Sequence, residues 1–264
     1  MWEIRKKIMR KVLIFALIFV LSAISTANAF EYIGHAEAVK NVEIRPEISA
    51  RITKIHFSEG TFIENSSTLF TLNTAQFQAE VSLKKAELSH AQAVLEGAKK
   101  YLSRLKAADQ RGVTASDVDT AESEVKQARA RVEEAKSELK ISQIQLNNTK
   151  ITAPFSGLVG KINYHQGSYV SPENVLCEIV QVNPIRILFA MPDRDYLKFK
   201  NSDKKLKYEL ILADDSLYTG TVEKDFEDNV MNPETGSINI RLKVNNENNI
   251  FLPGSLVRVR ITEE

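Results

Sequence analysis

Apolar residues alternate with polar ones in two separate stretches of the chain, residues 43–72 and 151–180, and the second stretch repeats the first. Four pairs of apolar residues share one constant offset: Ile55 and Ile162, Phe57 and Tyr164, Leu69 and Leu176, and Leu72 and Ile179. A period of two is typical of half-buried β-strands. The constant offset indicates two copies of one structural unit.

Each copy contains a glycine turn and a polar loop. Gly60 and Gly167 come directly before a new expected strand, where a turn often needs the positive φ that glycine adopts cheaply. The polar segments 64–67 and 171–174 then follow in the same order. One copy has too little apolar surface for a core of its own. We therefore expect the two copies to pack together as one small β-sandwich.

Between the copies, the apolar period changes to seven residues. The first arm has Val81, Leu88, Leu95 and Leu102 with Ala91, Ala98 and Leu105; the second has Val118, Val125, Val132, Leu139 and Leu146 with Ala121, Ala128, Ala135 and Ser142. Sustained heptads with small residues favour closely packed coiled-coil helices. Only residues 108–116 separate the arms, so the pattern predicts an antiparallel hairpin about 50 Å long. Lys84 is a polar residue on the expected seam, with its amine reaching water.

After Val182 the pattern returns to short strands separated by turn formers. The expected strands are 186–190, 207–212, 220–223, 237–244 and 256–261, and residues 31–42 could add an early one. Several short strands at this spacing suggest a small antiparallel barrel or sandwich.

Residues 1–29 have the layout of a secretory signal peptide, with a basic start, an apolar run at 12–21 and the small-residue site Ala27-Asn28-Ala29. The alternative is an uncleaved N-terminal anchor, although the run is shorter than the roughly 20 residues of a spanning helix. The formal net charge of the whole chain is +1, and cleavage would remove five basic residues and one acidic residue. The mildly acidic remainder argues against nucleic acid as a partner.

Three segments carry a resemblance to a known family. They are TKITAPFSGLVG at 149–160, LPGSLVRV at 252–259 and TGSINIR at 235–241. With the order of expected elements, they make the chain similar to the periplasmic adaptor subunits, or membrane fusion proteins, of tripartite efflux and secretion systems. The third segment is similar to a barrel motif of the adaptors that serve proton-driven (RND-type) pumps.

The resemblance implies an elongated, multi-domain α+β fold, in which a lipoyl-like β-sandwich is split by an antiparallel α-helical hairpin and followed by a small antiparallel β-barrel. The expected parts are a signal peptide at 1–29, a strand joining the barrel at 30–42, lipoyl-like halves at 43–73 and 149–182, the hairpin at 74–148 and the barrel at 183–264. Many relatives continue into a membrane-proximal domain. Because this chain ends at Glu264, we expect that domain to be absent or reduced.

The resemblance also implies partners. They are an inner-membrane transporter, an outer-membrane channel that docks on the hairpin tip, and further copies of the chain in a hexameric sleeve, with membrane contact only through partners. The family often carries arginine, leucine and serine at the tip, and the corresponding positions here are Ser103, Ala107 and Thr114. The candidate docking residues are Ser103, Arg104, Ala107, Gly112, Thr114 and Asp119. The residues that we expect to hold motif turns are Gly60, Pro154, Gly157, Gly167, Gly236, Pro253 and Gly254.

The sequence offers no catalytic, cofactor or metal site. The histidines (His35, His56, His90 and His165) and Cys177 lack metal-ligand spacing. No nucleophile with a base and no phosphate-binding glycine loop appears. A lipoyl or biotinyl carrier would need a lysine at a tight turn between its halves, and the hairpin occupies that place. We expect Cys177 to be a small core residue.

Three hypotheses therefore remain. The leading one is a periplasmic adaptor of a tripartite pump that exports small molecules, with an RND-type partner favoured over an ATP-driven exporter or a type I secretion system. The second is a periplasmic coiled-coil scaffold that conducts nothing. The third is a periplasmic binding protein for a metal or small ligand.

Overall fold

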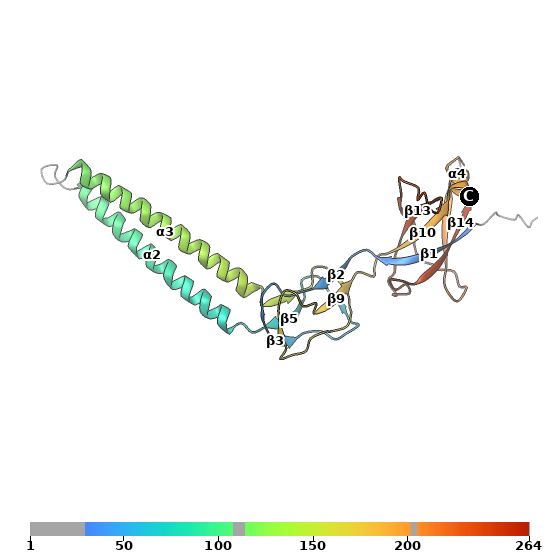
Figure 1. The fold of residues 1–264 in the computed structure, drawn as a ribbon, viewed down its shortest axis with the longest axis horizontal. Helices are drawn as coiled ribbons and strands as arrows, with labels where there is room; N and C mark the ends of the chain where they lie inside the picture. The colour runs from blue at the N-terminus through green and yellow to red at the C-terminus, as the bar shows by residue number, and fades with distance from the viewer. Residues whose placement is uncertain (1–29, 108–113, 202–204, 264) are drawn as a thin grey trace, which may run out of the picture. The chain divides into compact units, whose positions relative to one another are not determined.

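The computed structural model describes residues 30–107, 114–201 and 205–263. The chain divides into two compact units (Figure 1). One unit is Lys40–Gln181, and the other combines the described residues before Lys40 with those after Gln181.

The first unit contains a sandwich of two four-stranded sheets. One sheet has the order β2 (Asn41–Ile44), β9 (Cys177–Val180), β7 (Gly157–Val159) and β4 (Phe62–Ile63). The other has the order β6 (Lys150–Thr152), β5 (Thr68–Leu72), β3 (Ala50–Ile55) and β8 (Tyr169–Val170). Each sheet contains strands from both sequence repeats. The repeats therefore form one folded module, as the constant offset predicts.

The sandwich core lies at the paired positions of the two repeats. Leu69, Leu72, Leu176 and Ile179 are all completely buried. Cys177 occupies the place that Phe70 holds in the first repeat, and both are buried in the same cluster. This agrees with the predicted role of Cys177 as a core residue.

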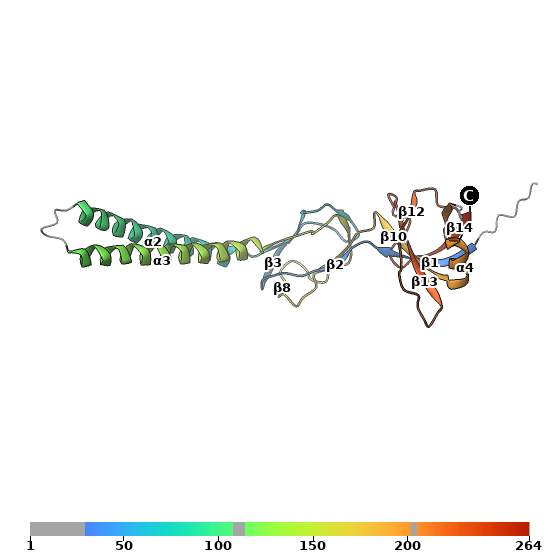
Figure 2. The same cartoon turned by 90° about the horizontal axis from the view of Figure 1, so that it is seen from above.

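The helices α2 (Ala75–Ala107) and α3 (Ala115–Asn147) lie between the two halves of the sandwich in the sequence, and in space they run side by side as a hairpin (Figures 1 and 2). Every heptad position predicted for the seam is buried or half-buried, and Ala121, Ala128 and Ser142 are the most enclosed. Lys84 donates hydrogen bonds to Glu138 of the opposite helix at 2.9 Å and to Glu87 at 3.0 Å. The predicted antiparallel hairpin is confirmed.

The second unit is a six-stranded antiparallel sheet curved around one core. Its order is β11 (Leu206–Ile211), β14 (Leu256–Glu263), β1 (Phe30–Ala38), β10 (Ile185–Pro192), β13 (Ser237–Val244) and β12 (Val222–Glu227). Along β10, the inward-facing Ile185, Ile187, Phe189 and Met191 alternate with more exposed residues. The edge strands β11 and β12 lie beside each other without forming a ladder.

Three details differ from the sequence-based expectation. The helix α4 (Asp193–Lys200) follows β10 and was not predicted. The strand β12 begins at Val222 and runs to Glu227, so it is longer than the expected 220–223 and lies later in the chain. Residues 41–42 begin β2 of the sandwich, whereas the expected barrel-joining strand ran to residue 42. Residues 1–29 lie outside the described residues.

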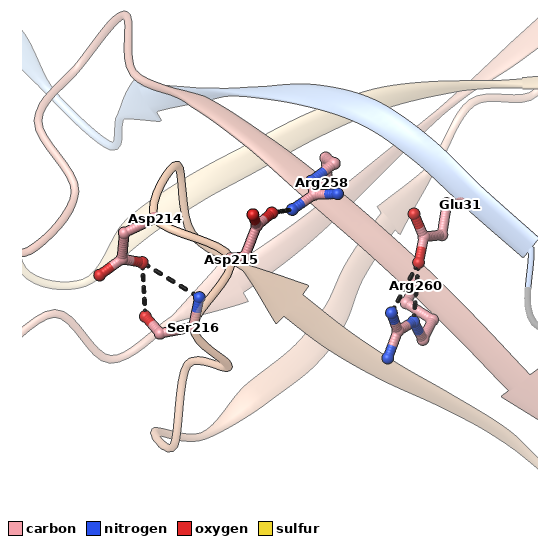
Figure 3. A network of polar contacts seen from close by, with 6 residues as sticks. All are labelled: Glu31, Asp214, Asp215, Ser216, Arg258 and Arg260. Atoms are coloured by element: carbon pink, nitrogen blue, oxygen red, sulfur yellow. Dashed lines mark hydrogen bonds and ion pairs between the residues drawn. The ribbon is translucent and has the colours of Figure 1, made fainter.

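Ion pairs link neighbouring strands on the outer face of the curved sheet (Figure 3). Arg260 of β14 donates two hydrogen bonds, at 2.7 and 2.9 Å, to one carboxylate oxygen of Glu31 on β1. Arg258 pairs with Asp215, which lies in the loop after β11, and Ser216 donates to Asp214 in the same loop. These acidic residues are therefore occupied in local structural contacts.

Candidate docking site at the hairpin tip

The end of α2 and the start of α3 bring five of the six predicted docking residues to one end of the hairpin. Ser103, Arg104 and Ala107 are exposed in the last turns of α2. Thr114 and Asp119 are exposed at the start of α3. Gly112 lies outside the described residues. The exposed set is mostly small and polar, which suits close packing against helices of another protein.

Thr114 has a structural role at this end. It is the N-cap of α3, and its hydroxyl oxygen accepts a 3.2 Å hydrogen bond from the amide of Asp117. In return, the amide of Thr114 donates to the Asp117 carboxylate at 2.9 Å. This capping box satisfies two amides that the first helical turn leaves without partners. The hydrogen bonds from the Thr114 hydroxyl and amide also lower the pKa of the Asp117 carboxyl.

One ion pair joins the two helices near the tip. Lys106 of α2 donates a 2.6 Å hydrogen bond to Glu122 of α3. Leu105 and Val118 are half-buried beside this contact, at the last described turns of the seam. The heptad pattern located the apolar pair, but Lys106 and Glu122 were missed. The sequence feature that could have identified this pair is a basic residue and an acidic residue next to the seam on opposite arms.

The motif residues in the two units have distinct geometries. Gly60, Gly167, Gly236 and Gly254 have φ values of +73°, +94°, +58° and +89°. Gly157 instead lies where a β-carbon would be 2.5 Å from the carbonyl oxygen of Val180, so its lack of a side chain allows close strand packing. Pro154 lies in the exposed turn before β7, and Pro253 lies in the exposed turn before β14.

The described residues contain no cluster of metal-ligating side chains. Residues 30–107, 114–201 and 205–263 hold no group of three or more His, Cys, Asp or Glu side chains able to bind one metal ion. Burial raises the pKa of the Cys177 thiol to about 12. No helix within these ranges has both the length and the apolar character of a membrane span.

Two family models match consecutive parts of the chain. The barrel-sandwich hybrid domain of the RND membrane fusion proteins matches residues 40–181, which contain the split sandwich and its hairpin. The β-barrel domain of the same proteins matches residues 184–264. The chain belongs to the RND membrane fusion proteins. This membrane fusion protein therefore comes from a family of adaptors, as its sequence motifs indicate.

Curated relatives of this membrane fusion protein carry efflux-pump names. The multidrug efflux pump subunit AcrA of Escherichia coli K12 is 30% identical over 242 residues, which cover 87% of this chain and 61% of AcrA. The efflux pump periplasmic linker BepD of Brucella suis is 26% identical over 249 residues, covering 89% of this chain and 62% of BepD. The chain thus spans about three fifths of the length of these relatives.

A solved structure supports the fold of this membrane fusion protein. The crystal structure of a putative efflux transporter from Bacteroides eggerthii superposes with a TM-score of 0.69 at 18% identity. The match covers 88% of this chain and 68% of that chain. At this identity the likeness concerns the fold alone, namely a split β-sandwich with a helical hairpin and a β-barrel.

Proposed function

We propose that this membrane fusion protein is the periplasmic adaptor of a tripartite efflux pump. It bridges an inner-membrane transporter, of the RND type, and an outer-membrane channel, and so helps to export small molecules. The role is mechanical and not catalytic, because energy for transport comes from the transporter.

The observation that carries this proposal is the hairpin inserted into the sandwich. Two helices of 33 residues each give an arm of about 50 Å, at about 1.5 Å per residue. The arm is braced along its length by a heptad seam and near its tip by the Lys106–Glu122 pair. A braced arm with a small polar tip is suited to contact a distant partner.

In this proposal the tip residues Ser103, Arg104, Ala107, Thr114 and Asp119, together with Gly112, dock on the outer-membrane channel. The β-barrel contacts the transporter. Alanine-rich outer faces of the hairpin pack against neighbouring copies in a ring, for which we propose six subunits. Residues 1–29 direct export to the periplasm, and the protein is held at the inner membrane through its transporter.

The proposal is tested by photocrosslinking in cells of the native bacterium. A cysteine at Ala107, which is exposed near the tip, carries a photoreactive maleimide. A cysteine at Val230, which is 66% exposed after β12, probes the barrel. We expect the first variant to capture an outer-membrane protein and the second to capture an inner-membrane transporter.

Two controls make the result specific. Gln92→Cys places the same reagent on an exposed position of α2 away from the tip, and it should not capture the channel. The unmodified protein controls for Cys177, whose burial keeps it from reacting. Capture of nothing except further copies of this chain from Ala107→Cys would favour the coiled-coil scaffold and contradict the adaptor.

A further inference from the structure

A cavity of about 240 Å³ opens within the barrel unit, between α4 and the edge strands β11 and β12. Its lining comes from five elements of the fold. The lining residues are Met191, Tyr196, Phe199, Lys200, Leu206, Tyr208, Lys224, Glu227 and Ile240. None of the roles proposed above uses this cavity.

The cavity exists because the sheet does not close completely. The strands β11 and β12 are the two edges of the six-stranded sheet, and no ladder joins them. The pairing of β12 with β13 is also irregular between Lys224 and Phe226. An irregularity of this kind turns a strand locally and re-aims its side chains. The unpaired edges therefore leave room under α4 that a closed barrel of this size would fill with side chains.

The inner part of the cavity is apolar and aromatic. Met191, Phe199 and Ile240 belong to the buried core, with exposed fractions of 1%, 7% and 3%. Tyr196 and Tyr208 are half-buried and pack against the same core. This surface suits a flat hydrophobic ring, because apolar and aromatic linings supply most of the contact area in small-molecule sites.

The rim of the cavity has an excess of positive charge. Both carboxylate oxygens of Glu227 are occupied, one by the Tyr196 hydroxyl at 2.7 Å and the other by the Lys224 amine at 2.7 Å. Lys200 lies over the Tyr196 ring, 5.2 Å from its centre. Among the described residues, no carboxylate comes within ion-pair distance of Lys200. Besides the hydrogen bonds from Lys224 and Tyr196, its charge helps to lower the pKa of the nearby Glu227 carboxyl, and Lys200 and Lys224 together outnumber this one carboxylate at the rim.

We propose that this cavity is a binding site for a compact aromatic anion, such as an aryl sulfonate or aryl carboxylate. The ring lies between Tyr196, Tyr208 and the apolar floor, and the anionic group meets Lys200 at the rim. The volume is below the roughly 300–1,000 Å³ of sites for drug-sized ligands, which limits the occupant to one or two rings. The site rests on the geometry of the barrel and not on the bridging role.

The test compares two fluorescent probes with the same rings. Naphthalene-2-sulfonate carries one negative charge, and the neutral naphthalene-2-sulfonamide lacks it. We expect the full chain to bind the sulfonate with one-to-one stoichiometry and the uncharged probe at least about tenfold more weakly, because a hydrogen bond to a charged group is lost. Lys200→Gln should weaken sulfonate binding by a similar factor and leave binding of the uncharged probe unchanged.

Lys198→Gln is the matched control, because it removes the same charge from the same helix at a residue that does not line the cavity. It should bind the sulfonate as the unmodified chain does. Leu206→Trp, which fills the cavity, should abolish binding of both probes while circular dichroism shows an intact fold. Equal binding of the two probes, or equal loss from Lys198→Gln and Lys200→Gln, would overturn the proposal. If Leu206→Trp does not fold, the comparison of Lys198→Gln with Lys200→Gln decides the test.

Discussion

The amide of Gly60 donates a 2.9 Å hydrogen bond to the carbonyl oxygen of Val159, although the whole hairpin lies between them in the sequence. The equivalent bond in the other repeat joins the amide of Gly167 to the carbonyl oxygen of Ile52 at 2.8 Å. Each repeat thus supplies the glycine turn for one bond and the acceptor strand for the other. The sandwich is held together by this reciprocal exchange, and neither half can complete its sheets alone.

The reciprocity predicts that the two glycine turns contribute equally to stability. Gly60 and Gly167 both have positive φ, and nothing lies within 4 Å of a β-carbon added at either position. Gly60→Ala and Gly167→Ala should each therefore lower the free energy of unfolding by about 1–2 kcal/mol through backbone strain alone. Urea denaturation followed by circular dichroism measures the loss. If only one variant lowers the free energy of unfolding, the two repeats are not energetically equivalent.

Gly157 should be intolerant of a side chain for a different reason. A β-carbon there would lie 2.5 Å from the carbonyl oxygen of Val180 and 2.9 Å from its carbonyl carbon, both on backbone that is fixed in β9. We expect Gly157→Ala to destabilise the sandwich by about 1–3 kcal/mol.

Gly97→Ala is the control for this prediction. Gly97 lies within α2, and nothing comes within 4 Å of an added β-carbon. The same change there should stabilise the protein by about 0.5–1 kcal/mol, because alanine is the better helix former. Equal effects of the two substitutions on the urea midpoint would contradict the packing explanation.

Periodic features of the sequence predicted most of the fold. The constant offset located both halves of the sandwich, and the heptads located every buried seam position of α2 and α3. These signals are strong because they repeat over many residues. The antiparallel barrel followed from turn formers between short strands, although β12 was placed too early because its irregular pairing with β13 breaks the alternation.

Single, non-repeating features were harder to predict. The helix α4 has only eight residues, too few for a clear apolar period, but it begins after Pro192, has Asp193 and Asp195 in its first turn and ends with basic residues. Those helix-end signals could have identified it. At the tip, the sequence suggested that Thr114 contacts a partner, and it did not reveal that the Thr114 side chain caps α3, since capping depends on where the helix starts.

Lys84 and Glu138 should be coupled across the hairpin seam. The Lys84 side chain is 24% exposed, and its hydrogen bonds to Glu138 and Glu87 raise its pKa. Because only the contact with Glu138 joins the two helices, Glu138→Gln should lower the thermal midpoint of the protein more than Glu87→Gln does. In a double-mutant cycle with Lys84→Met, the coupling to Glu138 should shrink between about 0.05 and 0.5 M salt. If the cycle gives no coupling energy, Lys84 contributes to the seam through packing only.

Cys177 should make the stability of the sandwich fall at alkaline pH. Burial raises the pKa of its thiol to about 12, whereas the thiol of an unfolded chain titrates at about 8.5. The folded chain keeps the proton over this interval and the unfolded chain loses it, so stability is full below about pH 8.5 and declines as the pH rises. Urea denaturation at a series of pH values measures the decline. Cys177→Ala should remove this part of the slope, and an unchanged slope would assign it to other groups.

The capping box at the tip separates a structural role of Thr114 from a docking role. Thr114→Ala removes the hydroxyl that accepts from the amide of Asp117, and it should destabilise the start of α3 by about 1 kcal/mol, whereas Thr114→Ser should retain the cap. Hydrogen exchange of the α3 amides measures this difference. If the hydroxyl serves only as a cap, Thr114→Asn, whose side-chain oxygen also caps helices, should retain crosslinking of a channel protein from Ala107→Cys.

Acid should weaken the same box. The hydrogen bonds from Thr114 lower the pKa of the Asp117 carboxyl, so the stabilisation is complete above the ordinary aspartate pKa of about 4 and is lost as the pH falls through the lowered value. Asp117→Asn should remove this dependence while leaving the amide-to-hydroxyl bond in place. Protection factors of the amides at the start of α3 that stay constant from about pH 5 to well below the ordinary aspartate pKa of about 4 would contradict this role of the Asp117 charge. Since the tip is the proposed contact with the channel, loss of channel crosslinking in the same acidic interval would link the order of this helix end to docking.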